Sequence, residues 1–203
     1  VHALDAAGAE EAVSSAAATL GGIDDLFVTA GVLHMGPLTD QAADAIDETL
    51  AVNLAASVYL ARAAYSHLSK SAGSLTLFTS SSFTKGRPNY AVYSATKAAI
   101  VNLMQALADE WSSANIRVNA VAPGPVDTPM TQVLHSAAFR QQYTAAIPAA
   151  RYGLTAEIDT LFAKLEHCVA DERGLCGFVV TDREPRAHAA GTHGAQGFRQ
   201  VRR

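Results

Sequence analysis

Tyr93 and Lys97 are the residues of this sequence whose types and spacing are best suited to chemistry at an alcohol oxygen. They are four positions apart, so a helix places both on the same face, one turn apart. An ammonium group beside a phenol favours the phenolate, and we therefore predict that Lys97 lowers the pKa of Tyr93 from its ordinary value of ~10 towards neutral pH. Such a tyrosine can act as a general acid or base.

Ser80 is expected to meet this pair from a neighbouring strand. Residues 73–80 have the apolar, β-branched and aromatic content of a buried strand, with Ser80 at its carboxyl end. In an open parallel sheet that end faces the ligand crevice, so the Ser80 hydroxyl and the Tyr93 phenol can converge on one substrate oxygen. A Tyr-x-x-x-Lys spacing is also common on solvated helix faces, and the neighbouring motifs must decide between the two interpretations.

The order of the predicted elements indicates the fold class. Apolar runs alternate with helical patterns, as in parallel strands joined by crossover helices. Strands are predicted at residues 25–30, 74–79, 116–121 and 177–181. Helices are predicted at residues 10–20, 40–68, 91–113 and 156–170. We therefore predict an α/β fold with a doubly wound, Rossmann-like parallel sheet, formed by a single domain over residues 1–184 and followed by a tail, 185–203, of disordered composition.

Three segments resemble the short-chain dehydrogenase/reductase family, in the family's order. Residues 24–31 (Asp-Asp-Leu-Phe-Val-Thr-Ala-Gly) resemble its strand ending in Asn-Asn-Ala-Gly, and residues 52–54 (Val-Asn-Leu) resemble its helix with an active-site asparagine. Residues 119–128 match its Pro-Gly segment beside the nicotinamide. The resemblance runs from about Asp5 to Gly177, which is most of the chain.

Ser80, Tyr93 and Lys97 match the other members of the family's catalytic tetrad. Ser81 and Ser82 follow directly, but the sequence offset to the tyrosine favours Ser80. The resemblance implies an oxidoreductase that interconverts an alcohol and a carbonyl by hydride transfer with NAD or NADP.

The resemblance also assigns a role to each residue. Tyr93 would be the acid/base, Lys97 would lower its pKa and hold the nicotinamide ribose, and Ser80 would hydrogen-bond the substrate oxygen. Asn53 would anchor a water from a locally distorted helix. The cofactor would be held by Asp5, Ala30, Gly31, Tyr93, Lys97, Pro123, Gly124, Val126 and Thr128.

Two of these assignments have alternatives. Asn53 could be a helix-interior polar residue that bonds back to its own backbone. Asp5, which resembles the family's adenine-contacting aspartate, could be a plain surface carboxylate.

The sequence departs from the family pattern in two places. Val28 and Thr29 stand where members usually carry two asparagines. None of the 14 glycines forms a Gly-x-x-x-Gly-x-Gly motif between an apolar strand and a helix. We therefore expect a domain that is incomplete at its amino end and keeps the nicotinamide half of the site, and the choice between NAD and NADP stays open.

Composition excludes several other classes of protein. The net charge of −4 leaves no basic footprint for nucleic acid, and no apolar run reaches the ~18 residues of a membrane span. The two cysteines, Cys168 and Cys176, suggest neither a disulfide framework nor a metal site. No serine lies in the Gly-x-Ser-x-Gly elbow of a serine hydrolase. A cytoplasmic enzyme acting on a small-molecule alcohol or carbonyl is the expected class, with a non-catalytic fragment or scaffold subunit as the alternative.

Two further expectations concern the surface. The helices at 40–68 and 91–113 are rich in small residues, and in the resembling family such helices often form a homo-oligomer interface, although packing on the chain's own sheet explains them too. Residues 128–153 form a long connection with scattered apolar residues, which predicts short helices that fold over a substrate. His34 and Met35 are candidates for lining the same pocket.

Overall fold

The structure, a computed structural model, describes residues 4–166 and contains a three-stranded parallel sheet in the order β1-β2-β3. Its helices and strands follow one another as α1 (Ala6–Leu20), β1 (Asp25–Val28), α2 (Ala43–Leu50), α3 (Ala56–Ser71), β2 (Ser74–Phe78), α4 (Ala91–Glu110), β3 (Arg117–Val121), α5 (Pro129–Leu134), α6 (Ala137–Ala146) and α7 (Thr155–Glu166). This alternation around a parallel sheet confirms the predicted α/β class.

The central strand β2 sets the register of the sheet. Leu77 lies opposite Val28 of β1 and opposite Ala120 of β3. Each crossover between successive strands passes through helices, as parallel pairing requires. The carboxyl ends of all three strands therefore lie at the same end of the sheet.

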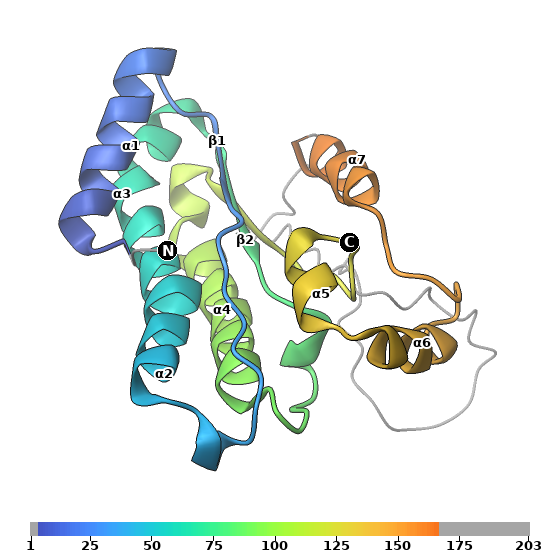
Figure 1. Cartoon of the computed structure of the whole chain (residues 1–203). Helices are drawn as coiled ribbons and strands as arrows, with labels where there is room; N and C mark the ends of the chain where they lie inside the picture. The colour runs from blue at the N-terminus through green and yellow to red at the C-terminus, as the bar shows by residue number, and fades with distance from the viewer. Residues whose placement is uncertain (1–3, 167–203) are drawn as a thin grey trace, which may run out of the picture.

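The hydrophobic core lies on one face of this sheet, where α1, α3 and α4 pack (Figure 1). Alternate strand residues point into it, since side chains of a strand alternate between its two faces. Small residues on the helices let the helix backbones approach the sheet. The buried cluster includes Val28, Ala61, Ala64, Leu68, Leu75, Leu77, Ile100, Met104, Ala108, Val118 and Ala120.

The predicted strands and helices are found with shifted ends. The first strand was expected to reach Ala30, but β1 stops at Val28, where its pairing with β2 ends. Thr29 and Ala30 beyond it are exposed. The last described helix begins at Thr155, one residue before its predicted start. The predicted strand 177–181, the end of the helix predicted at 156–170 and the tail 185–203 lie outside the described residues.

The prediction of one continuous helix at 40–68 is wrong. The chain instead forms α2, a π-helical turn at Ala51–Ala55, and α3. The N–H of Ala56 donates to the carbonyl of Ala51, which is one residue farther than in an α-helix. This distortion contains Asn53, where the family resemblance implies a locally distorted helix.

The connection from Thr128 to Gly153 contains two short helices, as its pattern predicts. Thr128 caps α5 through a reciprocal pair of hydrogen bonds with Thr131, and Pro129 occupies the first helical position. Helices α5 and α6 lie on the other side of the strands from α1, α3 and α4 (Figure 1). They are thus placed near the carboxyl end of β3, from which the connection begins.

Gly73, just before β2, lies in close contact with the backbone that leads into β1. A methyl group at this position would lie 2.0 Å from the carbonyl oxygen of Asp24 and 2.8 Å from the hydroxyl of Ser71. We expect Gly73→Ala to lower the free energy of unfolding by about 3 kcal/mol, because the strand must shift to relieve the overlap. Urea denaturation measures this change. Gly86→Ala is the control, since nothing lies within 4 Å of its added methyl; equal stability of the two variants would contradict the prediction.

Candidate functional site

Tyr93 and Lys97 lie one turn apart near the start of α4, as their spacing predicts. Lys97 is buried, with 4% of its surface exposed. Its ammonium donates a hydrogen bond of 2.9 Å to the carbonyl oxygen of Phe78, the last residue of β2, and lies 5.7 Å from the centroid of the Tyr93 ring. The amino end of α4 is thereby fixed against the carboxyl end of β2.

Ser80 is brought to this pair from the end of β2. Its hydroxyl accepts from the N–H of Ser82 at 3.2 Å and lies close enough to Tyr93 to lower the pKa of that phenol. Ser82 is buried, and the N–H of Ser81 donates to the carbonyl of Pro123. Of the three consecutive serines, Ser80 is the one that acts on the pKa of Tyr93.

The prediction that Lys97 lowers the pKa of Tyr93 is wrong for this structure. Burial raises the pKa of Tyr93 above its ordinary value, and the hydrogen bond from Ser80 offsets only part of that increase. The Lys97 ammonium is directed at the Phe78 carbonyl rather than at the phenol oxygen. Burial also lowers the pKa of Lys97 to about 8, because an ammonium group loses hydration in the protein interior.

Asn53 joins the π-helical turn to the segment that follows β1. Its side-chain oxygen accepts from the N–H of Val32 at 2.8 Å, and its amide nitrogen donates to the carbonyl of the same residue at 2.9 Å. The amide nitrogen also lies 3.4 Å from the hydroxyl of Thr96 on α4. The bonds made by this side chain are thus to other segments, and not to its own helix as the alternative interpretation proposed.

Gly31 lies between Asn53 and Lys97. A methyl group at this position would lie 3.5 Å from the side-chain oxygen of Asn53 and 3.5 Å from the ammonium of Lys97. The absence of a side chain therefore keeps space beside both polar groups. Ala30, the other predicted cofactor contact of this segment, is exposed next to it.

The segment after β3 supplies the remaining predicted cofactor residues. Pro123 accepts the hydrogen bond from Ser81, which ties the ends of β2 and β3 together. Val126 forms a bridge with Gly153 and accepts from the hydroxyl of Thr131. Gly124 and Thr128 lie in the same half-buried segment.

Asp5 has a local role in the structure. Its carboxylate caps α1 and accepts from the N–H of Gly8 at 2.7 Å. An adenine contact for Asp5 stays a prediction.

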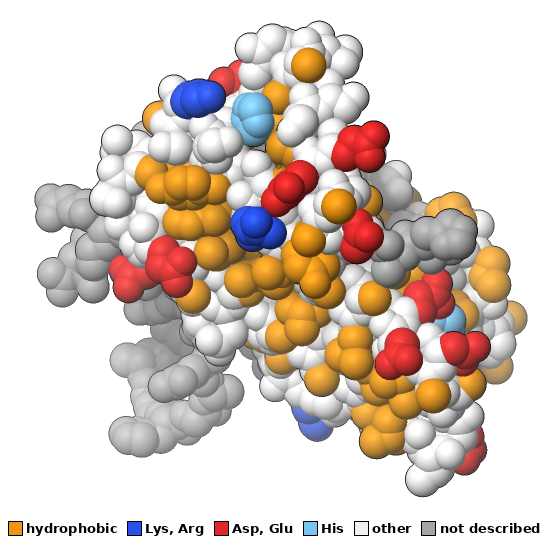
Figure 2. Space-filling view, turned by 90° about the vertical axis from the view of Figure 1, so that its left-hand side faces the viewer, with side chains coloured by type: hydrophobic (Ala, Val, Ile, Leu, Met, Phe, Trp, Pro, Cys, Tyr) orange, Lys and Arg blue, Asp and Glu red, His pale blue; other side chains and the backbone are white. Residues whose placement is uncertain are grey.

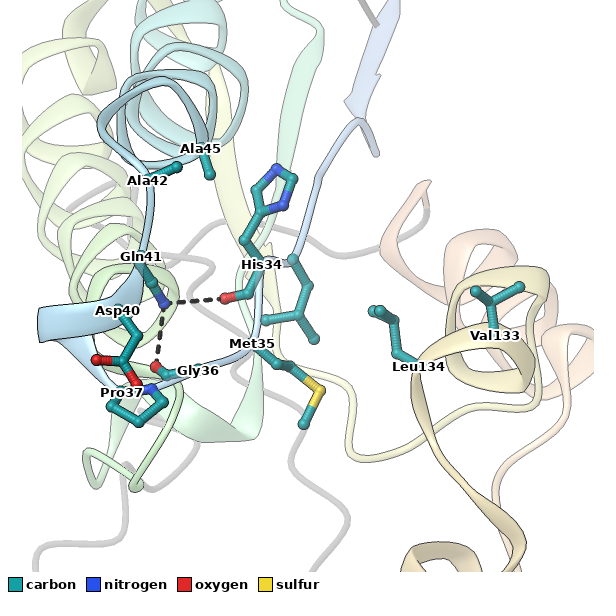
Figure 3. Close-up of a pocket in the computed structure, with 11 residues that line it drawn as sticks. His34, Met35, Gly36, Pro37, Asp40, Gln41, Ala42, Ala45, Val133 and Leu134 are labelled. Atoms are coloured by element: carbon teal, nitrogen blue, oxygen red, sulfur yellow. Dashed lines mark hydrogen bonds between the residues drawn. The ribbon is translucent and has the colours of Figure 1, made fainter.

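A pocket of about 710 Å³ opens between the loop after β1 and α5. Met35 and Leu134 face one another across it, and His34 points away from them towards α2 (Figure 3). The side chain of Gln41 donates to the carbonyls of His34 and Gly36, which holds the loop in shape. His34 also contacts Glu48 at 2.7 Å.

Tyr90, His135 and Tyr152 form a group that the sequence analysis did not find. The ring nitrogens of His135 lie 3.4 Å from the hydroxyl of Tyr90 and 3.0 Å from that of Tyr152. The ring of Tyr90 packs edge-on against Tyr93, with 6.3 Å between centroids. One signal was available, since Tyr90 and Tyr93 are three positions apart and such residues are neighbours on a helix.

Comparisons with known proteins agree with this geometry. The family model described as enoyl-(acyl carrier protein) reductase matches residues 2–168. The chain belongs to the short-chain dehydrogenase/reductase family.

Two curated relatives illustrate the extent of the similarity. The chain is 43% identical over 108 residues to the bifunctional ribulose 5-phosphate reductase/CDP-ribitol pyrophosphorylase of Haemophilus influenzae, covering 53% of this chain and 23% of that protein. It is 35% identical over 153 residues to a 2-(S)-hydroxypropyl-CoM dehydrogenase of Xanthobacter autotrophicus, covering 72% of this chain and 60% of that one. The chain therefore spans less than two thirds of the length of these relatives.

Solved structures show the same fold with a cofactor. A gluconate 5-dehydrogenase from Burkholderia cenocepacia in complex with NADP and tartrate superposes with a TM-score of 0.79 at 25% identity, covering 90% of this chain and 72% of that one. This relationship supports NAD or NADP as the cofactor of the family to which the chain belongs.

The residues of the chain fit such a group. A side chain at Gly31 would fill the space beside the Lys97 ammonium, which lies at the carboxyl end of β2. A metal site is not indicated, since residues 4–166 contain no group of three or more His, Cys, Asp and Glu side chains that could hold an ion. No helix in the same part of the chain has the length and apolar character to cross a bilayer.

The buried Lys97 predicts a specific pH dependence of stability. Its pKa is about 8 in the folded state against an ordinary 10.5, so the unfolded chain binds more protons between these values. The free energy of unfolding should therefore rise with pH across this window, by about 3 kcal/mol for the full shift. Urea denaturation of the chain and of Lys97→Met, at pH values at both ends of the window, measures the contribution of Lys97 to this change in the free energy of unfolding. Parallel pH profiles for the two proteins would contradict it.

Proposed function

We propose that this chain carries the catalytic half of an oxidoreductase that interconverts an alcohol and a carbonyl by hydride transfer with NAD or NADP. The observation that carries the proposal is the convergence of Ser80, Tyr93 and Lys97 at the carboxyl end of a parallel sheet. Ser80 follows β2, whereas Tyr93 and Lys97 belong to α4. The buried hydrogen bond from Lys97 to the Phe78 carbonyl joins these two elements, which distinguishes the pair from a Tyr-x-x-x-Lys spacing on a solvated helix.

In the direction of carbonyl reduction, Tyr93 donates a proton to the carbonyl oxygen. Its raised pKa keeps the phenol protonated at neutral pH, so the proton is present, although transfer is most efficient when the pKa of the donor lies nearer the working pH. The hydroxyl of Ser80, which lies close enough to Tyr93 to act on its pKa, can donate to the same oxygen as negative charge develops on it. When bound, the nicotinamide ring supplies or accepts the hydride.

Lys97 and Asn53 have binding and positioning roles around the reacting groups. Lys97 is placed to contact a ribose through the space that Gly31 leaves open. Asn53 fixes Val32 and so the segment that lines the start of the pocket. Its position in a π-helical turn supports a role for its backbone in binding a water, since such turns often mark functional sites.

The pocket between Met35 and Leu134 is the proposed place for the rest of the substrate. Its loop is tied to the catalytic helix, because the N–H of Gly36 donates to the carbonyl of Asn89, next to Tyr90. The small-molecule alcohol or carbonyl therefore enters between this loop and α5.

One serine variant and one tyrosine variant test the site. In a chain extended at its amino end by the segment that the relatives carry, Ser80→Ala and Tyr93→Phe should each lower kcat by about 100-fold or more, because each removes a proton donor at the reacting oxygen. The rate is followed by nicotinamide absorbance with a panel of carbonyl compounds. Ser81→Ala is the matched control and should keep full activity. Substantial turnover by Tyr93→Phe would overturn the proposed function.

We also propose that the protein forms a homo-oligomer through the helices at 40–68 and 91–113. Apolar side chains gather on the side of the molecule turned towards the viewer in Figure 2, where α1 and α3 lie. Val58 and Tyr65 are seven positions apart on α3, hence on one face, and are 37% and 42% exposed. The ring of Tyr65 packs on that of the buried Trp111, which directly follows α4, with 5.2 Å between centroids, so this surface adjoins the end of α4.

Val58→Glu is expected to convert this oligomer to a monomer, because the carboxylate would be buried without a partner in a symmetric interface. Size-exclusion chromatography with light scattering measures the mass. Val133→Glu, which changes another exposed apolar residue on α5, is the control and should leave the mass unchanged. A monomeric unsubstituted chain would show that these helices pack only on their own sheet.

A further inference from the structure

His135 occupies an unusual position at the end of α5, because both of its ring nitrogens face a phenol. Nε2 lies 3.4 Å from the hydroxyl of Tyr90, and Nδ1 lies 3.0 Å from the hydroxyl of Tyr152. A neutral imidazole has one donor and one acceptor, and each phenol can donate or accept. A single tautomer of His135 therefore satisfies both contacts at once.

The charged groups around His135 favour its neutral form. Burial lowers the pKa of His135, and the guanidinium of Arg140 on α6 lowers it further. Arg140 lies 4.3 Å from the ring centroid of Tyr152 and is paired with Asp127 at 2.8 Å. On the Tyr90 side of His135, burial raises the pKa of Tyr90, and the positive charge of Arg87 offsets part of that increase. The neutral ring can thus accept from one phenol while donating to the other.

Aromatic packing holds the imidazole in this orientation. Phe139 of α6 lies 4.6 Å and Tyr143 lies 6.4 Å from its ring centroid. Tyr152 packs edge-on at 5.9 Å and is itself buried, with 6% of its surface exposed. A histidine fixed by three rings has little freedom to turn its nitrogens elsewhere.

The Tyr90 end of this chain of contacts reaches the proposed acid/base. Tyr90 is the residue that precedes α4, and its ring contacts that of Tyr93 edge-on at 6.3 Å. A second contact lies beside it, where the guanidinium of Arg87 lies 5.0 Å from the ring centroid of Tyr143. The contact of Arg87 with Tyr143 and the hydrogen bond between Tyr90 and His135 both join the loop before α4 to the segment 128–153.

We propose that His135 is a positioning residue, which holds the segment 128–153 against the start of α4 and fixes the Tyr90 phenol beside Tyr93. The hydrogen-bonded chain from Tyr90 through His135 to Tyr152 couples the closure of the pocket wall at Leu134 to the placement of the acid/base. The effect of His135 on the placement of Tyr93 for catalysis rests on the proposed function. Its effect on how the segment 128–153 packs against α4 does not.

Hydrogen exchange measured by mass spectrometry on the full chain tests the closure directly. His135→Phe keeps the ring that packs on Phe139 and removes both hydrogen bonds, and Tyr90→Phe removes only the first. Tyr90→Phe should speed amide exchange in α5 and α6 by about tenfold, the value of one net hydrogen bond, and His135→Phe should speed it further because it removes two. Exchange in β2 and β3 should not change.

Two further variants separate hydrogen bonding from packing. His135→Gln, which keeps a donor and an acceptor, should restore part of the protection. Tyr143→Phe is the matched control, because it preserves the stacked ring and removes a hydroxyl outside the chain of contacts. The double variant Tyr90→Phe/His135→Phe should exchange no faster than His135→Phe alone, since both changes break the same link.

The outcomes are distinct from those that test the dehydrogenase activity. Unchanged exchange in α5 and α6 for His135→Phe would overturn the proposal, and so would an equal increase in β2 and β3, which indicates general destabilisation. In the chain extended at its amino end, His135→Phe should raise KM for the carbonyl substrate more than it lowers kcat. If Tyr93→Phe kept its activity, the proposed function would fail while the exchange result still decided the role of His135.

Discussion

The placement of the site depends on a two-way contact between the end of β2 and the first turns of α4. The Lys97 ammonium donates to the carbonyl of Phe78, and the hydroxyl of Thr79 donates back to the carbonyl of Lys97. Both side chains are buried, so water does not compete for these bonds. Ser80 follows this contact directly, and Tyr93 lies one turn before Lys97. The contact therefore places the Ser80 and Tyr93 hydroxyls close together.

A similar arrangement fixes the neighbouring strand. The Asn53 side chain bonds to both backbone groups of Val32, which holds the chain after β1 where its ladder with β2 has already ended. The apolar core supplies most of the stability of the domain, but it is non-directional and fixes no single hydroxyl. The polar contacts at the carboxyl ends of the strands give the site its geometry, and each involves a buried group that would be costly to leave unpaired.

Local patterns in the sequence predicted the parts of the site that local structure determines. The spacing of Tyr93 and Lys97 fixed their common helix face, and the alternation of elements predicted the parallel sheet. The pKa of Tyr93 could not be predicted in the same way, because it depends on burial by residues distant in the sequence. The contact of Tyr90 with His135, 45 positions later, likewise depends on how α5 returns to the start of α4.

The two pKa changes at the site act together under the proposed function. Burial raises the pKa of Tyr93 and lowers that of Lys97 to about 8, so the two groups are both protonated at neutral pH but only the lysine titrates close to it. Of the two groups, Lys97 is therefore the one whose charge changes with pH close to the working range of the proposed enzyme. The same burial that makes the Lys97 charge costly to the fold thus makes that charge sensitive to pH beside the proposed acid/base.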